Sequence, residues 1–252
     1  MHSNLKGKRA LVSGSSKGIG FFIAKKLIDE GYQVIINGRD LNQLNKATSE
    51  LKSSIGIKAD LTKCSEAKML IEKTEEKLGG LDILVCNVGS GKSVPIGKET
   101  HKEWQRVFDI NLWSTTNLIE AGRCLLEKSK GSIICISSIC GKEVITGAPL
   151  TYSVAKAALN AYVKGISKNL GESGVRINAI CPGNILFEGS VWDNKLQKNP
   201  GMVKKMLDKN VPLKKLGTGE DVANLASFLS SDEASFATGG IWVLDGGQTQ
   251  CF

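Results

Sequence analysis

A tyrosine and a lysine four residues apart carry the clearest chemistry in this sequence of 252 residues. Tyr152 and Lys156 lie in an alanine-rich segment that we expect to be helical, and residues four apart share one face of a helix. A cation beside a phenol favours the phenolate and lowers the pKa of the phenol from about 10. We therefore expect Tyr152 to act as an acid or base near neutral pH. The pair alone does not define a site, because it arises by chance in many helices.

A glycine-rich stretch near the N-terminus is the second chemical feature. Gly14, Gly18 and Gly20 follow an apolar run at Arg9–Ser13 and open a segment with helical spacing. A glycine turn between a strand and a helix brings backbone N–H groups and the positive end of the helix dipole to the phosphates of a dinucleotide. The alternative is a tight turn that only packs the helix against the strand.

The residues after the second expected strand indicate which dinucleotide is bound. An acidic residue there would bind the 2′-hydroxyl of the adenosine ribose, whereas a basic residue accommodates a 2′-phosphate. Arg39 offers a bidentate fork to a phosphate, and Lys17 supplies a second cation. Asp40 begins the next helix, where its nearer role is an N-cap. We therefore predict NADP(H) as the cofactor.

Short apolar segments alternate with helical ones along the chain. Seven expected strands lie at Arg9–Ser13, Gln33–Asn37, Ile57–Ala59, Leu81–Cys86, Ser132–Ser137, Arg176–Cys181 and Ile241–Leu244. Expected helices lie at Gly18–Glu30, Leu41–Lys52, Ala67–Leu78, Lys102–Glu127, Tyr152–Leu170 and Glu220–Leu229. Apolar strands alternating with helices are typical of a parallel sheet covered on both faces. We predict an α/β fold: a single doubly wound Rossmann-type domain over residues 1–252, with a seven-stranded parallel sheet and helices on both faces.

The stretch at residues 183–216 interrupts this alternation. It is too long for an ordinary connection, and long insertions in compact domains are usually lids or binding loops. Its apolar residues include Phe187, Val191, Trp192, Met202, Met206 and Leu207. We predict a substrate lid over a mostly apolar pocket, which favours an acyl or ring ketone over a free sugar. The alternative is that the residues at 202, 206 and 207 only pack a lid helix onto the body.

Composition excludes several classes of protein. The chain is 41% hydrophobic and 23% charged, as in an ordinary globular protein and unlike disordered, collagenous or coiled-coil chains. The formal net charge of +8 suits an anionic partner, but the basic residues are scattered and lack interleaved aromatic residues. We expect no nucleic-acid partner.

Cysteine and histidine usage argues against a metal site. The seven cysteines include no C-x-x-C pair, and the sequence has only two histidines. No hydrophobic leader opens the sequence, and no apolar run approaches ~18 residues. We expect a cytoplasmic protein with reduced thiols, no metal and no membrane partner.

Taken in order, the motifs resemble those of the short-chain dehydrogenase/reductase family along nearly the whole chain. They are the Gly14–Gly20 turn, Asp60-Leu61, Asn87-Val88-Gly89, Asn111, Ser138, Tyr152 with Lys156, Pro182-Gly183 and Asp245-Gly246-Gly247. The resemblance implies an NADP(H)-dependent oxidoreductase that interconverts a ketone or aldehyde and a secondary alcohol by hydride transfer.

The resemblance also implies four catalytic residues. Tyr152 would donate the proton to the carbonyl oxygen, and Ser138 would hydrogen-bond and orient the same oxygen. Lys156 would hold the nicotinamide ribose and lower the pKa of the tyrosine. Asn111 would hold a water that links the lysine to solvent.

A larger set of residues is implied to bind the cofactor, with Asp60 at the adenine and Asn87 on the adenosine side. The full set is Gly14, Ser16, Lys17, Gly18, Ile19, Gly20, Arg39, Asp60, Leu61, Asn87, Gly89, Tyr152, Lys156, Pro182 and Gly183. Two residues depart from the family pattern. Val88 replaces the usual alanine of N-A-G, and Phe187 stands about where the family has a threonine that touches the carboxamide.

Several substrates are compatible with this resemblance. The overall pattern is closest to 3-oxoacyl-carrier-protein reductase-like members, and a basic surface suits an acidic acyl carrier protein. Carrier docking in that family uses basic residues near the entrance; Lys128 and Lys130 could serve on one side, but Glu172–Gly174 lacks the expected arginine. The alternative is a stand-alone reductase or dehydrogenase of a small ketone, sugar or steroid-like alcohol.

A non-catalytic NADP-binding regulator is the hypothesis from another class, and the presence of all four catalytic residues argues against it.

The family also implies a homotetramer, with the helices at Lys102–Glu127 and Tyr152–Leu170 forming the interfaces. The apolar tail Gln250-Cys251-Phe252 could reach toward a neighbouring subunit. An exposed terminus is the alternative for this tail.

Overall fold

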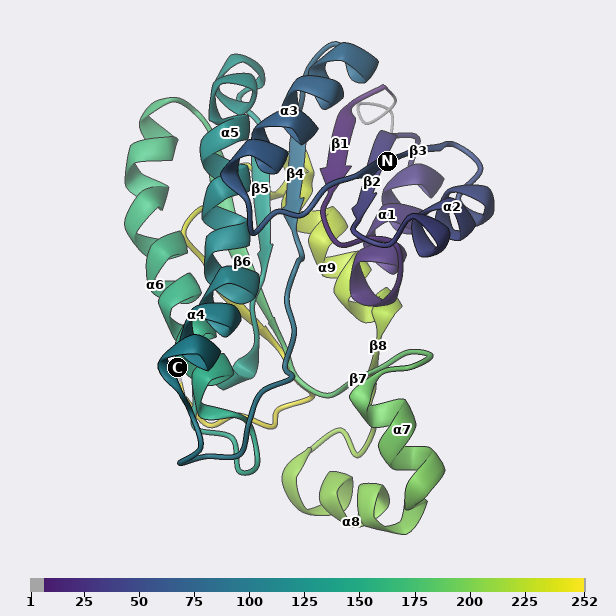
Figure 1. The fold of residues 1–252 in the computed structure, drawn as a ribbon, viewed down its shortest axis with the longest axis vertical. Coiled ribbons are helices and arrows are strands. Elements are labelled where there is room, and N and C mark those ends of the chain that lie inside the picture. The colour runs from purple at the N-terminus through teal and green to yellow at the C-terminus, as the bar shows by residue number, and fades with distance from the viewer. Residues whose placement is uncertain (1–6, 252) are drawn as a thin grey trace.

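The computed structural model describes residues 7–251 and arranges them around one parallel sheet (Figure 1). The order of its seven strands is β3-β2-β1-β4-β5-β6-β9, and each neighbouring pair is parallel. Their bounds are β1 Arg9–Val12, β2 Gln33–Gly38, β3 Ser54–Lys58, β4 Ile83–Cys86, β5 Ser132–Ile136, β6 Arg176–Pro182 and β9 Ile241–Leu244. The predicted doubly wound Rossmann-type fold is confirmed.

Helices cover both faces of the sheet because alternate strand residues point to opposite sides. On β1, Leu11 belongs to one buried cluster, whereas Ala10 and Val12 belong to the other. The cluster of Leu11 is completed by α3 (Cys64–Leu78), α5 (Ser114–Ser129) and α6 (Leu150–Glu172). The opposite cluster is completed by α1 (Gly18–Asp29), α2 (Leu41–Glu50) and α9 (Gly219–Ser230). Both sides of each central strand are therefore apolar, which explains the continuous apolar runs in the sequence.

The expected helix at Lys102–Glu127 is not one regular helix. It consists of α4 (His101–Phe108), a π-helical turn at Asp109–Trp113 and then α5. Such a turn leaves the chain helical but widens one turn by a residue, so apolar periodicity does not reveal it. Asn111 lies in this widened turn.

The third strand also begins earlier than expected. β3 starts at Ser54, which pairs with Val34 of β2, rather than at Ile57. Most of its side chains are exposed or only partly buried, because β3 is the edge strand. Its sequence therefore lacks the apolar run that marks the central strands.

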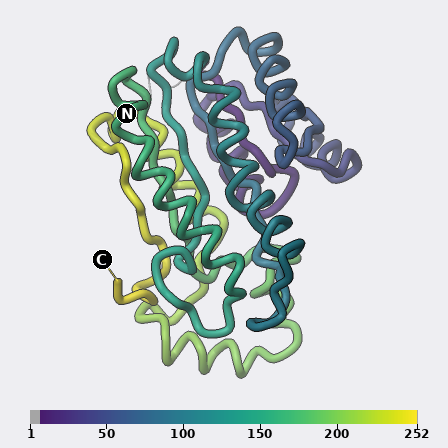
Figure 2. Tube along the Cα trace, turned by 60° about the vertical axis from the view of Figure 1, so that its left-hand side comes forward, coloured from purple at the N-terminus to yellow at the C-terminus, as the bar shows by residue number. Residues whose placement is uncertain are grey.

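The expected lid contains regular structure of its own. β7 (Ile185–Leu186) pairs in parallel with β8 (Gly217–Thr218), and the chain between them forms α7 (Val191–Lys198) and α8 (Pro200–Asn210). Figures 1 and 2 both show this segment beyond the carboxyl ends of the central strands. Of the expected packing residues, Leu207 is partly buried and Met202 is exposed, whereas Val203 is fully buried and anchors α8.

Three further features of residues 7–251 bear on the earlier expectations. No helix in this range has both the length and the apolar character needed to cross a membrane. The range contains no group of three or more potential metal-ligating side chains. Its cysteines are all free thiols.

Candidate active site

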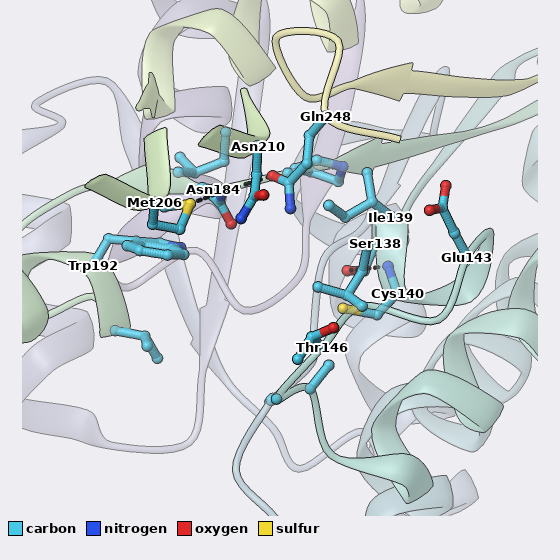
Figure 3. A pocket seen from close by; sticks show the side chains of 18 of the residues that line it. Ser138, Ile139, Cys140, Glu143, Thr146, Asn184, Trp192, Met206, Asn210 and Gln248 are labelled. Atoms are coloured by element: carbon cyan, nitrogen blue, oxygen red, sulfur yellow. Dashed lines mark hydrogen bonds between the residues drawn. The ribbon is translucent and has the colours of Figure 1, made fainter. Parts of the chain in front are cut away.

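Two adjoining cavities lie at the carboxyl ends of the strands, where ligands bind in open α/β sheets. The smaller, of about 520 Å³, is lined by the glycine turn and by the residues that follow β1 to β4. The larger, of about 790 Å³, lies between the segments after β5, β6 and β9 and the lid helices (Figure 3). Both are lined by Ile19, Gly91, Ser137, Tyr152 and Phe187, so these residues mark the junction.

The glycine turn has the open backbone that a phosphate site needs. Gly14 and Gly18 have φ angles of +58° and +62°, in the left-handed region that favours glycine. Lys17, the N-cap residue of α1, makes no side-chain capping hydrogen bond, so the first N–H groups of the helix are free of a side-chain partner there. This combination fits the pyrophosphate of a dinucleotide.

Two asparagine side chains form hydrogen bonds with the backbone of the glycine turn. Asn87 donates through Nδ2 to the carbonyl oxygens of Ser13 and Gly14, at 3.2 and 2.9 Å. Asn37 accepts from the Gly14 N–H at 3.3 Å and donates to the carbonyl oxygens of Ile57 and Ala59, at 3.1 and 3.2 Å. The turn is thus fastened to β4, and through Asn37 to the end of β3.

Gly20 serves this packing and does not line either cavity. A Cβ at this position would collide with Nδ2 of Asn87 and would lie 2.7 Å from the carbonyl oxygen of Gly14. A glycine therefore lets α1 approach the end of β1 closely. Its part in cofactor binding stays a prediction; what the structure shows is its role in shaping the turn.

The residues that follow β2 and β3 form the far end of the smaller cavity. Arg39 Nη1 lies 3.7 Å from Oδ2 of Asp60, and the arginine side chain is 63% exposed. Burial alone would raise the pKa of Asp60, but hydrogen bonds from Thr62 and the charge of Arg39 outweigh it and hold the pKa below its usual value. Asp40 accepts from the Gln43 N–H at 2.9 Å, which confirms its predicted role as an N-cap. With Lys17 also on the wall, the cavity offers two cations at its open end.

The three catalytic candidates nearest the larger cavity lie together. Tyr152 and Lys156 share one side of α6, and Ser138, the second residue after β5, is hydrogen-bonded to Tyr152. The lysine is 2% exposed and donates through Nζ to the Ile136 carbonyl oxygen at 2.8 Å. Tyr152 lines both cavities and therefore lies at their junction.

The expectation that Lys156 lowers the tyrosine pKa is wrong here, because burial outweighs the nearby cation. Burial raises the pKa of Tyr152 to about 12, although the hydrogen bond with Ser138 acts in the opposite direction. Burial also lowers the pKa of Lys156 to about 8. The Lys156 ammonium lies 5.9 Å from the centroid of the tyrosine ring and donates a hydrogen bond to the Ile136 carbonyl oxygen. Desolvation therefore has the largest effect on the pKa values of both groups.

Asn111 lies next to this group through Gly89. A Cβ on Gly89 would lie 3.1 Å from Oδ1 of Asn111 and 3.2 Å from Nζ of Lys156. The asparagine amide donates to the carbonyl oxygens of Ser90 and Val107, at 3.1 and 3.0 Å, and accepts from the Ser90 N–H at 2.9 Å. It therefore holds the loop after β4 against the π-helical turn.

Pro182, Gly183 and Phe187 lie on the substrate side of the junction. Pro182 and Gly183 line the larger cavity and do not reach the smaller one. A Cβ on Gly18 would lie 3.0 Å from the ring of Phe187, so this ring covers the glycine turn. The residue in place of the usual threonine thus separates the two cavities.

Several site residues escaped the sequence analysis. Asn37 is 1% exposed, and its only signal was a single polar residue at the end of an apolar strand. Asn184 and Gln248 line the larger cavity from separate segments, where no local spacing relates them. With Thr146 and Asn210 they make its wall more polar than predicted, so the expectation of a mostly apolar pocket is wrong.

The expected carrier-docking lysines do not flank the pocket of their own chain. Lys128 and Lys130 precede β5 at its amino end, whereas both cavities lie at the carboxyl ends of the strands. Lys130 packs its aliphatic stem near Gly174 at that edge. Within one chain, these two lysines cannot contact a ligand that enters the larger cavity.

A parallel sheet of this order with a glycine turn after β1 defines a dinucleotide-binding protein, and comparisons with known proteins define its family. Residues 14–249 match a family described as Enoyl-(Acyl carrier protein) reductase. The chain is 33% identical to the 3-oxoacyl-[acyl-carrier-protein] reductase FabG of Chlamydia muridarum, over 98% of this chain and 99% of that one. The chain therefore belongs to the short-chain dehydrogenase/reductase family.

Solved structures agree with this assignment. L-Sorbose reductase from Gluconobacter frateurii, complexed with NADPH and L-sorbose, has a TM-score of 0.93 and 27% identity, with both chains covered completely. A 7α-hydroxysteroid dehydrogenase complexed with NADH and 7-oxo glycochenodeoxycholic acid has a TM-score of 0.89 and 29% identity, over 98% of this chain and 96% of that one. This chain is accordingly an oxidoreductase that acts on CH–OH groups with a nicotinamide cofactor.

Proposed function

We propose that the protein is an NADP(H)-preferring reductase of a ketone or aldehyde, with the alcohol as product. The observation that carries this proposal is the position of the Tyr152–Ser138 pair, where a cavity fit for a dinucleotide meets a cavity fit for a small molecule. The bound cofactor supplies the hydride. The side chains have only to bind, orient and protonate the carbonyl compound.

In this proposal, Ser138 and Tyr152 both donate hydrogen bonds to the carbonyl oxygen as it gains negative charge. Tyr152 then transfers its hydroxyl proton to that oxygen. Its pKa of about 12 means that the proton is present at neutral pH. Lys156, buried beside it, contributes positive charge below its own pKa of about 8 and would bind the ribose of the cofactor.

The NADP(H) preference rests on Arg39 and Lys17. Both line the open end of the smaller cavity, and no acidic residue stands at position 39 to bind a free ribose hydroxyl. Asp60 is a near neighbour of Arg39, but at 3.7 Å and with an exposed guanidinium the pair is loose enough for the arginine to turn toward a phosphate. Asp60 and Leu61 are proposed at the adenine.

A small carbonyl compound is the proposed substrate, and the segment at 183–216 is proposed as its lid. The polar wall of the larger cavity and the position of Lys128 and Lys130 favour a free small molecule over a substrate tethered to an acyl carrier protein. A 3-oxoacyl thioester is the second candidate, because the chain is similar to a 3-oxoacyl-[acyl-carrier-protein] reductase.

A direct assay separates these candidates. We expect the purified protein to oxidise NADPH faster than NADH with a simple activated diketone such as 2,3-butanedione. An acetoacetyl thioester, supplied as the N-acetylcysteamine derivative, should react more slowly at equal concentration. Faster turnover of the thioester would favour the second candidate, a 3-oxoacyl thioester, as the substrate. The absence of NADPH oxidation with every carbonyl compound, although NADPH binds, would overturn the proposed reaction.

We further propose that the protein is a homotetramer. Trp113, Leu150 and Val154 expose apolar surface along the α5–α6 side, and Trp242 and Val243 expose it on β9, which is an edge strand of the sheet. Exposed apolar patches and an uncovered sheet edge are typical of surfaces that associate. Two separate surfaces of this kind are what a tetramer built as a dimer of dimers requires.

Light scattering after size-exclusion chromatography should therefore give a particle of four times the 27.0 kDa chain. Charges placed on one surface at a time, Val154→Glu or Trp242→Glu, should each leave a particle of half that mass, because burying an unpaired charge is unfavourable. A particle of 27.0 kDa for the unmodified chain would contradict the proposal.

A further inference from the structure

The lid presents three lysines to the larger cavity. Lys195 comes from α7, Lys209 from α8, and Lys214 from the loop that follows α8. Among the described residues that line this cavity, Glu143 is the only acidic one, and it lies on the opposite side in Figure 3 from the lid residue Trp192. The wall supplied by the lid is therefore positively charged.

The spacing of the lid residues explains why these lysines converge. On α7, Trp192 and Lys195 are three residues apart and share one face of the helix. The ammonium of Lys195 lies 4.3 Å from the centroid of the Trp192 ring, and both residues line the cavity. On α8, Met206, Lys209 and Asn210 have the spacing of one face and line the same cavity. Each lid helix thus turns a mixed apolar and basic face inward.

No carboxylate among residues 7–251 lies within 4.0 Å of these three ammonium groups. Lys214 donates to the carbonyl oxygen of Asp208, a neutral acceptor that leaves its charge uncompensated. Asp193 on α7 accepts from the Gly189 N–H and from Gln197. Glu143 accepts from the Gln250 N–H at 2.8 Å. The carboxylates of Asp193 and Glu143 are therefore engaged with other groups.

Amide side chains add neutral donors to the same cavity. Asn184 donates to Oε1 of Gln248 at 2.6 Å, which leaves the Nε2 group of Gln248 available to a ligand. Figure 3 shows Asn184 and Asn210 close to Met206 on the side away from Ser138 and Glu143. Cations with nearby amide donors form a wall that matches an anion rich in acceptor oxygens.

We propose that the substrate is an oxo compound that carries a carboxylate or phosphate at the end remote from its carbonyl. The anionic group binds the basic lid wall, which we define as Lys195, Lys209 and Lys214, while the carbonyl oxygen meets Ser138 and Tyr152. This inference rests on the proposed function and names the substrate class of that site. Because the lysines are solvent-exposed, we expect each to contribute a few-fold in affinity and the wall together about 10-fold.

Matched pairs of carbonyl compounds test this inference. One pair is 4-oxopentanoate and its methyl ester; the other is dihydroxyacetone phosphate and dihydroxyacetone. We expect the anion of at least one pair to have a kcat/KM about 10-fold higher than its neutral partner at low ionic strength, mainly through KM. The ratio should approach one at 0.5 M salt, where screening is strong. The pair that responds distinguishes a carboxylate from a phosphate.

Variants locate the effect on the lid. The double substitution Lys195→Met and Lys209→Met should reduce the anion-to-neutral ratio of kcat/KM about 5-fold, because Lys214 remains. The control is Lys205→Met, on α8 but not on the cavity wall, which should leave the ratio unchanged. Equal kcat/KM values for anion and neutral partner, or a ratio that the double variant does not alter, would overturn the inference while leaving the proposed reduction intact.

A binding measurement decides the case in which no compound is reduced. That result would count against the proposed function, and the basic lid wall would then be judged by quenching of tryptophan fluorescence, since Trp192 lies beside Lys195. Quenching by the anions that weakens with salt and is lost in the double variant would support the wall. Equal quenching by anionic and neutral compounds, or none by either, would overturn it.

Discussion

Replacing Tyr152 by phenylalanine should lower kcat/KM for carbonyl reduction by about 10³-fold, with little change in the dissociation constant of NADPH. The substitution keeps the ring that borders both cavities and removes only the hydroxyl. A positioned general acid contributes roughly 10² to 10⁴ in rate, and Ser138 alone cannot replace the proton that Tyr152 donates. Steady-state NADPH oxidation and a fluorescence titration of NADPH measure the two quantities.

Tyr162→Phe is the matched control on the same helix. Tyr162 lies on α6, packs against the buried cluster beneath it and lines neither cavity. It should therefore retain the turnover of the unmodified protein. Retention of more than about a tenth of the turnover by Tyr152→Phe, well above the residual rate expected without a general acid, would exclude the tyrosine as the proton donor.

The parts of the site that sequence alone predicted depend on short-range spacing. Tyr152 and Lys156 had to share a helix face once the segment was helical, and the glycine turn had to lie between β1 and α1. The seven-stranded sheet was predictable for a related reason. Its central strands are buried on both faces, so each is a run of apolar residues that stands out from the helices.

The other features of the site depend on tertiary contacts, which the spacing of residues along the sequence does not reveal. The pKa of Tyr152 follows from how deeply the fold buries it, and burial outweighs the nearby lysine. The π-helical turn around Asn111 preserves the helical pattern of the flanking residues. The polar wall of the larger cavity joins Asn184, Asn210 and Gln248 from three separate segments. Strands of two residues, such as β7 and β8, are too short to leave a periodic signal.

The double substitution Arg39→Asp with Lys17→Ala should change the cofactor preference from NADPH to NADH, by about 10²-fold in the ratio of their kcat/KM values. A hydrogen bond to a charged group contributes roughly 1.5–3 kcal/mol, and we take the lower end for both residues because these side chains are exposed. The new aspartate could accept from a ribose hydroxyl and would repel a 2′-phosphate. Initial rates with both cofactors at several concentrations measure the ratio.

A control variant with the same change of net charge distinguishes direct binding of the 2′-phosphate from the effect of the protein's overall charge. Lys46→Asp with Lys52→Ala also lowers the net charge by three, but neither lysine lines the smaller cavity. Because both lysines are exposed and surface charges are screened by salt, this control should leave the cofactor ratio nearly unchanged. If both double variants shifted the ratio equally, the preference would come from net charge. If neither did, the 2′-phosphate would be bound by groups other than Arg39 and Lys17.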